Sequence, residues 1–370
     1  MKTPDSLFAS QLSIDLDAVA DNWRLLSSKL ATGQAGAAVK ADGYGLGIRP
    51  VVRSLWAAGC RDFFVAHPAE GLAVLEELSK ARVHVLNGLI PEAAAEYPRF
   101  GLIPVLNDLG QIAAWRELAK KTGRPLAADV HLDTGMCRLG LDRMETEKLL
   151  TDPTRCLAGI EVGLVISHLA SADEPASNQS ERQLAMFKRI RAHLSMGKAS
   201  LANSSGIFLG SNYHFDVARP GVALYGGNPT PDRPNPMRNP VTLKSRIIQL
   251  RSVDAPETVG YGATYKVEKP RIIATVPVGY ADGYQRRGSS TGHANLAGVA
   301  VPIVGRVSMD LITIDVTDAP AEARHAGAWI ELIGAKRTPD DIAREWGTIS
   351  YEVLTSLGRR YRRDYVGTGA

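Results

Sequence analysis

The sequence has 370 residues, of which 45% are hydrophobic and 22% are charged, and its formal net charge at pH 7 is +4. This composition is typical of a folded globular protein and excludes a long disordered or strongly basic chain, and the length suits two domains. The longest basic run, Arg359 to Arg363, is interpreted as a solvated segment, so no nucleic-acid partner is expected.

Cysteine, histidine and hydropathy patterns exclude several other classes of protein. The three cysteines, Cys60, Cys137 and Cys156, lie at no CxxC or metal-ligand spacing, and the eight histidines form no HExxH motif. We therefore expect neither a disulfide framework nor a metal site. No apolar run reaches the length of a membrane span, and residues 1–10 lack a signal-peptide pattern, so we expect a cytoplasmic protein without membrane contact.

Helices and short strands alternate through the first 220 residues. Apolar periodicity predicts helices at 16–30, 51–58, 69–80, 91–96, 109–122, 142–152 and 178–196, and strands before Lys40 and at 63–67, 83–86, 102–106, 127–133, 160–168, 199–203 and 215–219. Eight strands that alternate with helices predict parallel pairing and a TIM-type (β/α)8 barrel, assigned to residues 8–236. An open doubly wound sheet is the alternative, but no GxGxxG follows the first strand.

The pattern changes after a linker rich in proline and asparagine at 227–236. Strands are predicted at 241–253, 271–278, 299–304, 311–316 and 329–333, and only 339–345 and 351–357 look helical. Residues 237–370 are therefore expected to form a separate, mostly-β domain.

One stretch near the start, Ala37 to Gly47, combines a strand with a reactive side chain. Small and β-branched residues lead to Lys40, and three glycines follow within a short loop that also contains Tyr44. A lysine at a strand end can simply extend its amine into solvent. A lysine beside a glycine loop that can receive a phosphate can also form a Schiff base with a cofactor.

Other polar side chains also follow predicted strands. Asp133 to Arg138, His168, Asn203-Ser204 and Arg219 all come where a strand ends. In a barrel the carboxyl ends of the strands meet at one mouth, so these groups are expected to converge there with Lys40. Taken singly, His168 is a hydrogen-bonded strand-end histidine and Arg219 a salt-bridge partner, and Tyr261 and Met309 read as packing residues.

Several segments resemble those of a known family when they are taken together and in order. They read Val-Lys-Ala-Asp-Gly-Tyr-Gly-Leu-Gly at 39–47, Asp-Thr-Gly-Met-Cys-Arg-Leu-Gly at 133–140, Ser-His-Leu-Ala-Ser-Ala-Asp at 167–173, Ala-Asn-Ser-Ser-Gly at 202–206, Val-Ala-Arg-Pro-Gly at 217–221, Gly-Tyr-Gly-Ala-Thr-Tyr at 260–265, Pro-Val-Gly-Tyr-Ala-Asp-Gly-Tyr at 277–284 and Gly-Arg-Val-Ser-Met-Asp at 305–310. This series resembles the alanine racemases of fold type III, which depend on pyridoxal 5′-phosphate.

The resemblance implies a role for individual residues. Lys40 would hold the cofactor and act as one base, and Tyr261 of the other subunit of a homodimer would act as the second base on the opposite face. The residues implied in cofactor binding are Lys40, Tyr44, His168, Ser204, Arg219, Gly221 and Val222. Those implied in substrate binding are Arg138, Met309 and Tyr280, the last narrowing the entry.

Four departures from the family pattern bear on details. Asp42, Gly43 and Leu46 differ from the usual lysine motif, and Ser308 replaces a common cysteine. His131 stands where the family often has a carbamylated lysine that orients the arginine, so Arg138 must be oriented otherwise. The stretch 350–359 is taken to lack a phosphate-contacting tyrosine that some members have, with Arg359 nearby.

The implied activity is the interconversion of L-alanine and D-alanine, which would supply D-alanine for peptidoglycan or degrade it. A broad-specificity amino-acid racemase, a decarboxylase of the same fold type and a non-catalytic pyridoxal-phosphate-binding barrel are the alternatives. An arginine at position 219 argues against the decarboxylase, and a second domain that carries Tyr261 argues against the carrier.

Overall fold

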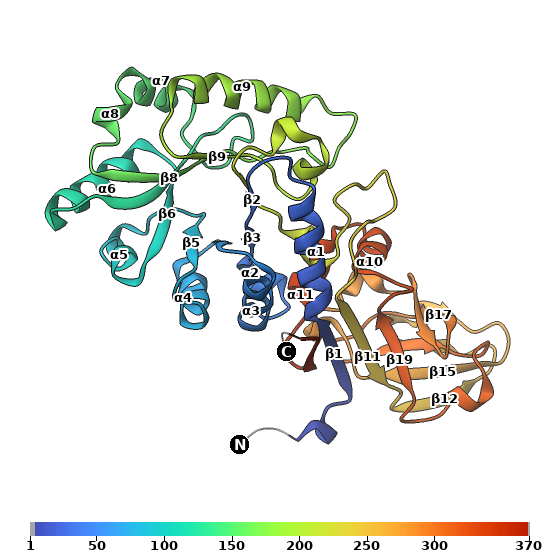
Figure 1. Cartoon of the computed structure of the whole chain (residues 1–370). Helices are drawn as coiled ribbons and strands as arrows, with labels where there is room; N and C mark the ends of the chain where they lie inside the picture. Colours follow the sequence, from blue (N-terminus) through green and yellow to red (C-terminus); the bar gives the residue numbers. More distant parts are fainter. Residues whose placement is uncertain (1–3, 369–370) are drawn as a thin grey trace.

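The computed structural model describes residues 4–368, and two large sheets organise them (Figure 1). The first is a parallel sheet in which seven strands pair in chain order, from β3 to β9. Together with β2 and β10, its strands are β2 (Gln34–Ala35), β3 (Ala37–Ala38), β4 (Asp62–Val65), β5 (Arg82–Val85), β6 (Leu102–Leu106), β7 (Leu126–His131), β8 (Ile160–Ile166), β9 (Lys198–Ser200) and β10 (Val217–Ala218).

Strand β10 closes this sheet into a barrel. It pairs in parallel with β2, and Gly36 N and Ala38 N donate to Ala218 O and Pro220 O at 2.9 and 2.8 Å. On its other side, Asp216 N and Arg219 N donate to Ala199 O and Ala202 O at 3.0 and 2.8 Å. Because β10 bonds to both edges, the predicted TIM-type barrel is confirmed.

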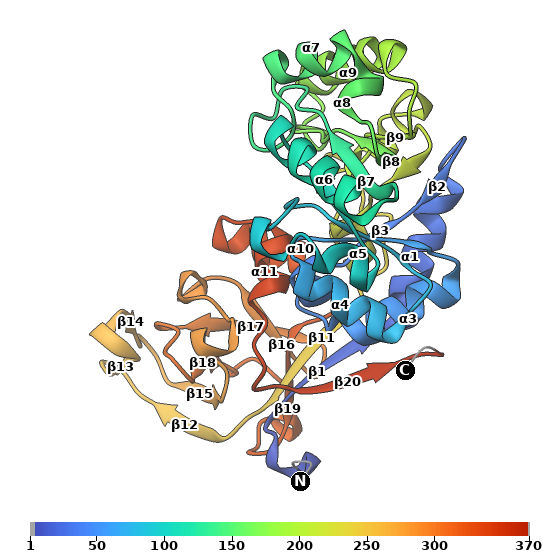
Figure 2. The ribbon, with the colours of Figure 1, turned by 90° about the vertical axis from the view of Figure 1, so that its left-hand side faces the viewer.

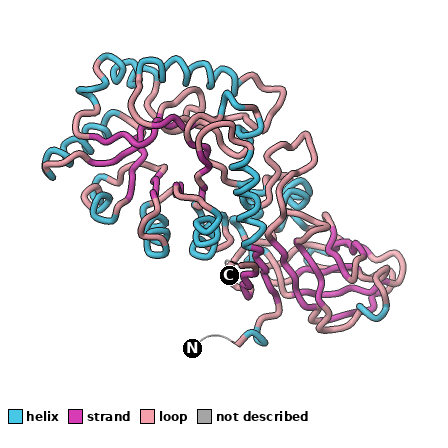
Figure 3. Tube along the Cα trace, viewed as in Figure 1, coloured by secondary structure: helices cyan, strands magenta, loops and turns pink. Residues whose placement is uncertain are grey.

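Helices cover the outside of the barrel, as Figure 3 shows. They are α1 (Leu16–Ser28), α3 (Ile48–Ala58), α4 (Pro68–Glu77), α5 (Glu96–Phe100), α6 (Leu109–Thr122), α7 (Arg143–Thr151), α8 (Pro153–Cys156) and α9 (Gln179–His193). Asp108 and Asp142 cap α6 and α7 by accepting bonds from backbone amides of the first turn. Four of the predicted helices are present but two to four residues shorter, the helix at 109–122 has the predicted bounds, and the one at 51–58 begins three residues earlier. The helix predicted at 91–96 is wrong: a 3-10 turn spans Pro91–Ala93, and α5 begins only at Glu96.

The second large sheet confirms the predicted β-rich domain. Its order is β12-β15-β18-β17-β16-β19-β11-β1-β20, and a small hairpin of β13 and β14 projects from it (Figure 2). Its elements are β11 (Val241–Arg246), β12 (Gln249–Val253), β13 (Thr258–Val259), β14 (Tyr265–Lys266), β15 (Arg271–Val276), β16 (His293–Leu296), β17 (Val299–Val304), β18 (Ile312–Asp315), β19 (Trp329–Ile333), α10 (Pro339–Trp346), α11 (Ser350–Ser356) and β20 (Arg362–Val366).

The assignment of the chain from residue 8 onward to the barrel is wrong for its first strand. Strand β1 (Ser10–Asp15) lies in the second sheet, antiparallel to β11 and parallel to β20. Its buried face consists of Ser10, Leu12 and Ile14, of which only two are apolar, and that alternation is too short to be recognised in the sequence. The predicted boundary between residues 236 and 237 stays a prediction.

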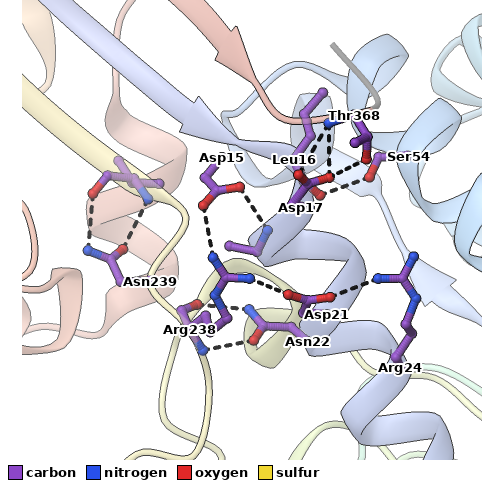
Figure 4. Close-up of polar contacts among 12 residues, drawn as sticks. Asp15, Leu16, Asp17, Asp21, Asn22, Arg24, Ser54, Arg238, Asn239 and Thr368 are labelled. Atoms are coloured by element: carbon purple, nitrogen blue, oxygen red, sulfur yellow. Dashed lines mark hydrogen bonds and ion pairs between the residues drawn. The ribbon is translucent and has the colours of Figure 1, made fainter.

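Polar contacts join the start of α1 to the chain that enters the second domain (Figure 4). Arg238 forms ion pairs with Asp15, at 3.2 Å, and with Asp21. The side chain of Asn22 accepts from Arg238 N at 2.8 Å and donates to Arg238 O and Leu224 O. These contacts fix the crossing between the two domains. Among residues 4–368, no helix combines the length and hydropathy that a membrane crossing requires.

A buried ionic network lies among the barrel strands. Both ring nitrogens of His84 contact carboxylates, Asp129 at 2.6 Å and Asp62 at 3.2 Å, and Arg82 binds Asp62 through two bonds. Burial alone would lower the pKa of His84, but the two carboxylates raise it to about 9. His84 is therefore a buried imidazolium between two aspartates.

This network predicts a pH dependence of stability. A folded-state pKa above the ordinary value of 6.5 stabilises the fold below pH 6.5, and that contribution is lost as the pH rises through about 9. We compare the free energy of unfolding of the wild type with that of His84→Gln. The difference between the two should decrease between these pH values, by about 1.4 kcal/mol for each pH unit. Denaturant unfolding at several pH values measures this, and parallel pH profiles for the two proteins would contradict it.

Candidate active site

A cavity of about 600 Å³ opens at the carboxyl ends of the barrel strands. Its lining includes eight residues that the sequence predicts for the site, namely Lys40, Tyr44, Arg138, His168, Ser204, Arg219, Gly221 and Val222. They follow β3, β7, β8, β9 and β10, as expected for a barrel whose strand ends meet at one mouth. The described lining contains Lys40, Arg138 and Arg219 but neither Asp nor Glu, so it favours anionic groups.

The short element α2 (Lys40–Tyr44) is a left-handed turn. The φ angles of Ala41, Asp42, Gly43 and Tyr44 are 53°, 54°, 63° and 54°. This conformation costs about 1–2 kcal/mol for each residue other than glycine, although aspartate adopts it more readily than most. Asp42 and Gly43, two of the departures from the family motif, thus suit the backbone that they occupy.

Contacts from outside the turn hold it in place. The side chain of Asp42 accepts from Ile48 N at 2.8 Å, which ties the turn to the start of α3. Strand β20 of the second domain contributes Arg363, which donates to Gly45 O at 2.7 Å, and Tyr365, which donates to Leu46 O at 3.0 Å. The conformation of the loop after Lys40 therefore depends on both domains.

The environment of Lys40 favours its neutral amine. Burial lowers the pKa of Lys40, and the guanidinium of Arg138 lowers it further, while Glu70 opposes them. A lysine with a lowered pKa has the lone pair that proton abstraction or Schiff-base formation requires.

Three tyrosines and a glycine shape one side of the cavity. Tyr44 stacks on Tyr225 with ring centroids 4.5 Å apart, and the ring of Tyr351 lies 6.0 Å from that of Tyr44. A Cβ on Gly221 would lie only 2.3 Å from the Tyr44 hydroxyl, so glycine allows the phenol to approach this backbone. Burial raises the pKa of Tyr44, which therefore remains a neutral hydrogen-bond donor.

Ser204 and the start of a 3-10 helix at Val222–Tyr225 lie beside this tyrosine. The Ser204 hydroxyl accepts from Gly221 N at 2.9 Å and from Ala223 N at 3.3 Å. Backbone amides, a serine hydroxyl and a tyrosine hydroxyl that gather around a glycine form a cradle suited to a phosphate.

Arg219 and His168 form the opposite part of the cavity. The guanidinium of Arg219 donates to the Ser200 hydroxyl, to Ser167 O at 2.6 Å and to His168 Nδ1 at 3.3 Å. Burial lowers the pKa of Arg219 to about 10, so it remains protonated at neutral pH. Burial and Arg219 lower the pKa of His168, whose proton must then lie on Nε2 because Nδ1 accepts from the arginine.

Arg138 lies on a loop that a single carboxylate organises. The side chain of Asp133 accepts from the backbone amides of Gly135 and Met136 at 2.9 Å, and also from that of Cys137. The loop returns to β7 where Leu141 N donates to His131 O at 2.8 Å. These bonds hold Arg138 beside the strand end that carries His131.

His131, which replaces the lysine typical of the family, has a defined tautomer. Asn107 donates from Nδ2 to Leu86 O and Val105 O, so its Oδ1 must accept the 2.7 Å bond from His131 Nδ1. Burial, together with the charges of Arg219 and Arg138, lowers the pKa of His131 to about 4. The neutral imidazole keeps a lone pair on Nε2, so His131, which lines the cavity together with Arg138, supplies an uncharged acceptor in place of the anion implied by the family pattern.

Two residues of the site were missed in the sequence: Tyr351, which lines the cavity, and Asn107, which bonds to His131 but does not line it. Tyr351 of α11 lines the cavity, so the interpretation that residues 350–359 lack a suitable tyrosine is wrong, and Arg359 is exposed and does not line it. Asn107 follows the apolar strand β6, and that position at a strand end was the signal that could have revealed it. Tyr351 gave no such signal because its helix lies in the second domain.

Three predicted site residues lie outside this cavity. Tyr261 is 71% exposed and lies in the turn that connects β13 to β14. Figure 2 shows this hairpin at the outer end of the second domain, away from the barrel. Tyr280 and Met309 are also exposed, and they lie close together because Tyr280 N donates to Ser308 O and Ala281 N to Met309 O. Within one chain, the structure does not bring these residues to Lys40.

The electrostatics of Lys40 lead to a prediction. In Arg138→Gln the pKa of Lys40 should rise, because a nearby positive charge is removed. The pH dependence of Lys40 acetylation by a limiting reagent, followed by mass spectrometry, measures that pKa. The control is Arg143→Gln, an exposed arginine paired with Glu147. Equal midpoints in the two variants would contradict the effect assigned to Arg138.

Comparisons with known proteins agree over the whole chain. Residues 14–229 match the family model "Alanine racemase, N-terminal domain" and residues 240–365 match "Alanine racemase, C-terminal domain". Alanine racemase of Rhodospirillum rubrum is 50% identical over 96% of both chains, and the catabolic alanine racemase of Agrobacterium fabrum is 46% identical over 98% of this chain and 93% of that protein. The crystal structure of alanine racemase from Bartonella henselae with covalently bound pyridoxal phosphate superposes with a TM-score of 0.93 at 39% identity, over 97% of this chain and 99% of that one. The chain belongs to the alanine racemase family.

Proposed function

We propose that this protein interconverts L-alanine and D-alanine with pyridoxal 5′-phosphate as its cofactor. The observation that carries the proposal is Lys40, an amine with a lowered pKa in a cavity that collects cationic and neutral hydrogen-bonding groups. Relatives named alanine racemase that match nearly the whole chain support it.

The residues of the cavity fit the proposed cofactor. Tyr44, Ser204 and the backbone at Gly221 and Val222 would hold its phosphate, and the absence of a Cβ on Gly221 lets the Tyr44 hydroxyl approach this backbone. Lys40 would hold it covalently. When bound, pyridoxal phosphate withdraws electrons from the α-carbon of an amino acid and so makes the α-proton acidic.

Arg219 would face the ring nitrogen of the cofactor. Because the guanidinium holds its proton at neutral pH and is fixed by Ser200 and Ser167, it cannot donate a proton as a carboxylic acid would. This limits how much negative charge the ring accepts. An arginine at this position thus favours return of the proton to the α-carbon over elimination or transamination.

Arg138 would bind the substrate carboxylate. It lines the cavity with Lys40, and the loop that carries it is fixed by Asp133 and by the return to β7. Neutral His131 leaves the full positive charge of this arginine for the substrate. Lys40 would then remove or deliver the α-proton on one face.

The second base is proposed to come from another copy of the chain. Racemisation requires proton transfer on both faces of the α-carbon, and Lys40 by itself can serve only one of them. Tyr261 is highly exposed on the second domain, as are Tyr280 and Met309. In a homodimer these exposed residues would complete the partner subunit's cavity, so that each of two sites uses both chains.

Exchange of the α-proton tests the proposed activity. Incubation of the protein with pyridoxal phosphate and L-alanine in deuterated water should produce D-alanine and deuterium at the α-carbon. Lys40→Ala should lose both, together with the visible absorbance of the bound cofactor. Tyr261→Phe should lose exchange in at least one direction, whereas the control Tyr265→Phe in β14 should retain it. Cofactor binding without any exchange in the wild type would exclude the racemase.

A mixed dimer tests the shared site. We expect Lys40→Ala and Tyr261→Phe to be inactive alone, and a heterodimer of the two, purified by separate affinity tags, to have about half of the wild-type activity. The reason is that one of its two sites combines an intact Lys40 with an intact Tyr261. A heterodimer as inactive as its parents would show that both residues must belong to the same chain.

A further inference from the structure

The carboxylate of Glu70 joins two consecutive strand-end loops of the barrel. Glu70 lies in the first turn of α4, where Oε2 accepts from Ala66 N at 2.8 Å and from His67 N at 3.0 Å. Its other oxygen, Oε1, accepts from Ala41 N at 2.6 Å. One side chain thus connects the loop after β4 with the residue that directly follows Lys40.

The bond to Ala41 is not required for capping α4. A glutamate at this position of a helix caps it through the backbone amide of the N-cap residue, which His67 N already provides. Ala41 is the first residue of the left-handed turn, with φ at 53°, and it carries a Cβ that disfavours this conformation. The carboxylate therefore acts on the backbone where the turn departs from ordinary geometry.

Glu145 of α7 provides an internal comparison. It occupies the same place in its helix, where Oε2 accepts from Asp142 N at 3.4 Å and Oε1 from Leu109 N at 3.1 Å. Its second bond leads to the start of α6, and neither Glu145 nor Leu109 lines the cavity. Both glutamates link neighbouring helical units, but only Glu70 reaches the lysine turn.

Charge distinguishes Glu70 further. The described lining of the cavity holds no carboxylate, and Glu70 is the acidic group that acts on Lys40 against burial and Arg138. Its two oxygens serve three amides on two loops, and a glutamine has only one acceptor oxygen. The amide would have to release one of the loops and would lose the charge.

We propose that Glu70 is a positioning residue for Lys40, which fixes the left-handed turn through Ala41 N and places a negative charge near the lysine amine. This inference deepens the proposed function and rests on it. Glu70 acts through the backbone next to Lys40 and does not line the cavity. Its loss should therefore alter the affinity for the cofactor and the protonation of the lysine together.

Cofactor capture by the full chain tests the proposal. The cofactor-free wild type, Glu70→Gln and Glu145→Gln are mixed with pyridoxal phosphate, and the rate and extent of capture are followed by visible absorbance across pH. For Glu70→Gln we expect an affinity for pyridoxal phosphate about tenfold weaker. The midpoint of the pH dependence of the capture rate should lie about half a pH unit lower, because the neutral amine forms more readily without the carboxylate. Arg138→Gln should move the midpoint in the opposite direction, and Glu145→Gln should move neither quantity.

A double variant keeps the test decisive if Glu70→Gln folds poorly. Glycine adopts a positive φ without steric cost, so Ala41→Gly combined with Glu70→Gln should recover part of the affinity while the midpoint stays at lower pH. If Glu70 only stabilised the fold, Glu70→Gln would have a lower thermal stability, as expected for Glu145→Gln, and the pH midpoint of its capture rate would equal that of the wild type.

The outcomes separate this inference from the proposed function. If the wild type captured no cofactor, or if Lys40→Ala captured it equally well, the proposed function itself would be wrong. If the wild type captured cofactor at Lys40 and Glu70→Gln matched it in affinity and midpoint, only the role of Glu70 would be overturned.

Discussion

The left-handed turn from Ala41 to Tyr44 is the constraint on which the site depends. It separates Lys40 from Tyr44 by one tight loop, so that the amine and the phenol both line one cavity. Three of its four residues carry a Cβ in a conformation that L-amino acids disfavour, so the turn persists only because other parts of the chain hold it. Helices α4 and α3 each contribute a residue that bonds to the turn, and strand β20 bonds to Gly45, the residue that follows it.

The two domains support this turn because the chain passes between them more than once. Strand β1 begins in the second sheet and leads directly into the first barrel helix, and β20 returns beside β1 at the end of the chain. The ion pairs of Arg238 fix the crossing between them. A domain that was joined by a linker alone could not place Arg363 and Tyr365 on the lysine loop.

Fixed protonation is the second property of the site. His168 and His131 are held neutral by burial and by neighbouring arginines, and each has its tautomer set by a hydrogen-bond partner. Lower in the barrel, His84 is charged because two carboxylates surround it. The same residue type thus takes opposite charge states within one barrel, according to whether arginines or aspartates lie nearby.

The sequence by itself determined the succession of barrel and β-rich domain, because helical and strand periodicities are local properties. It also placed Lys40, Arg138, His168, Ser204 and Arg219 at one mouth, because the carboxyl ends of barrel strands meet there, whereas Tyr44, Gly221 and Val222 were expected from the resemblance to the alanine racemases. Tertiary structure decided the rest: β1 joins the second sheet through pairing with strands more than 200 residues away, and Tyr351, Asn107 and Glu70 reach the site by packing between elements. Such long-range contacts leave no local pattern, since they depend on how the chain folds back on itself.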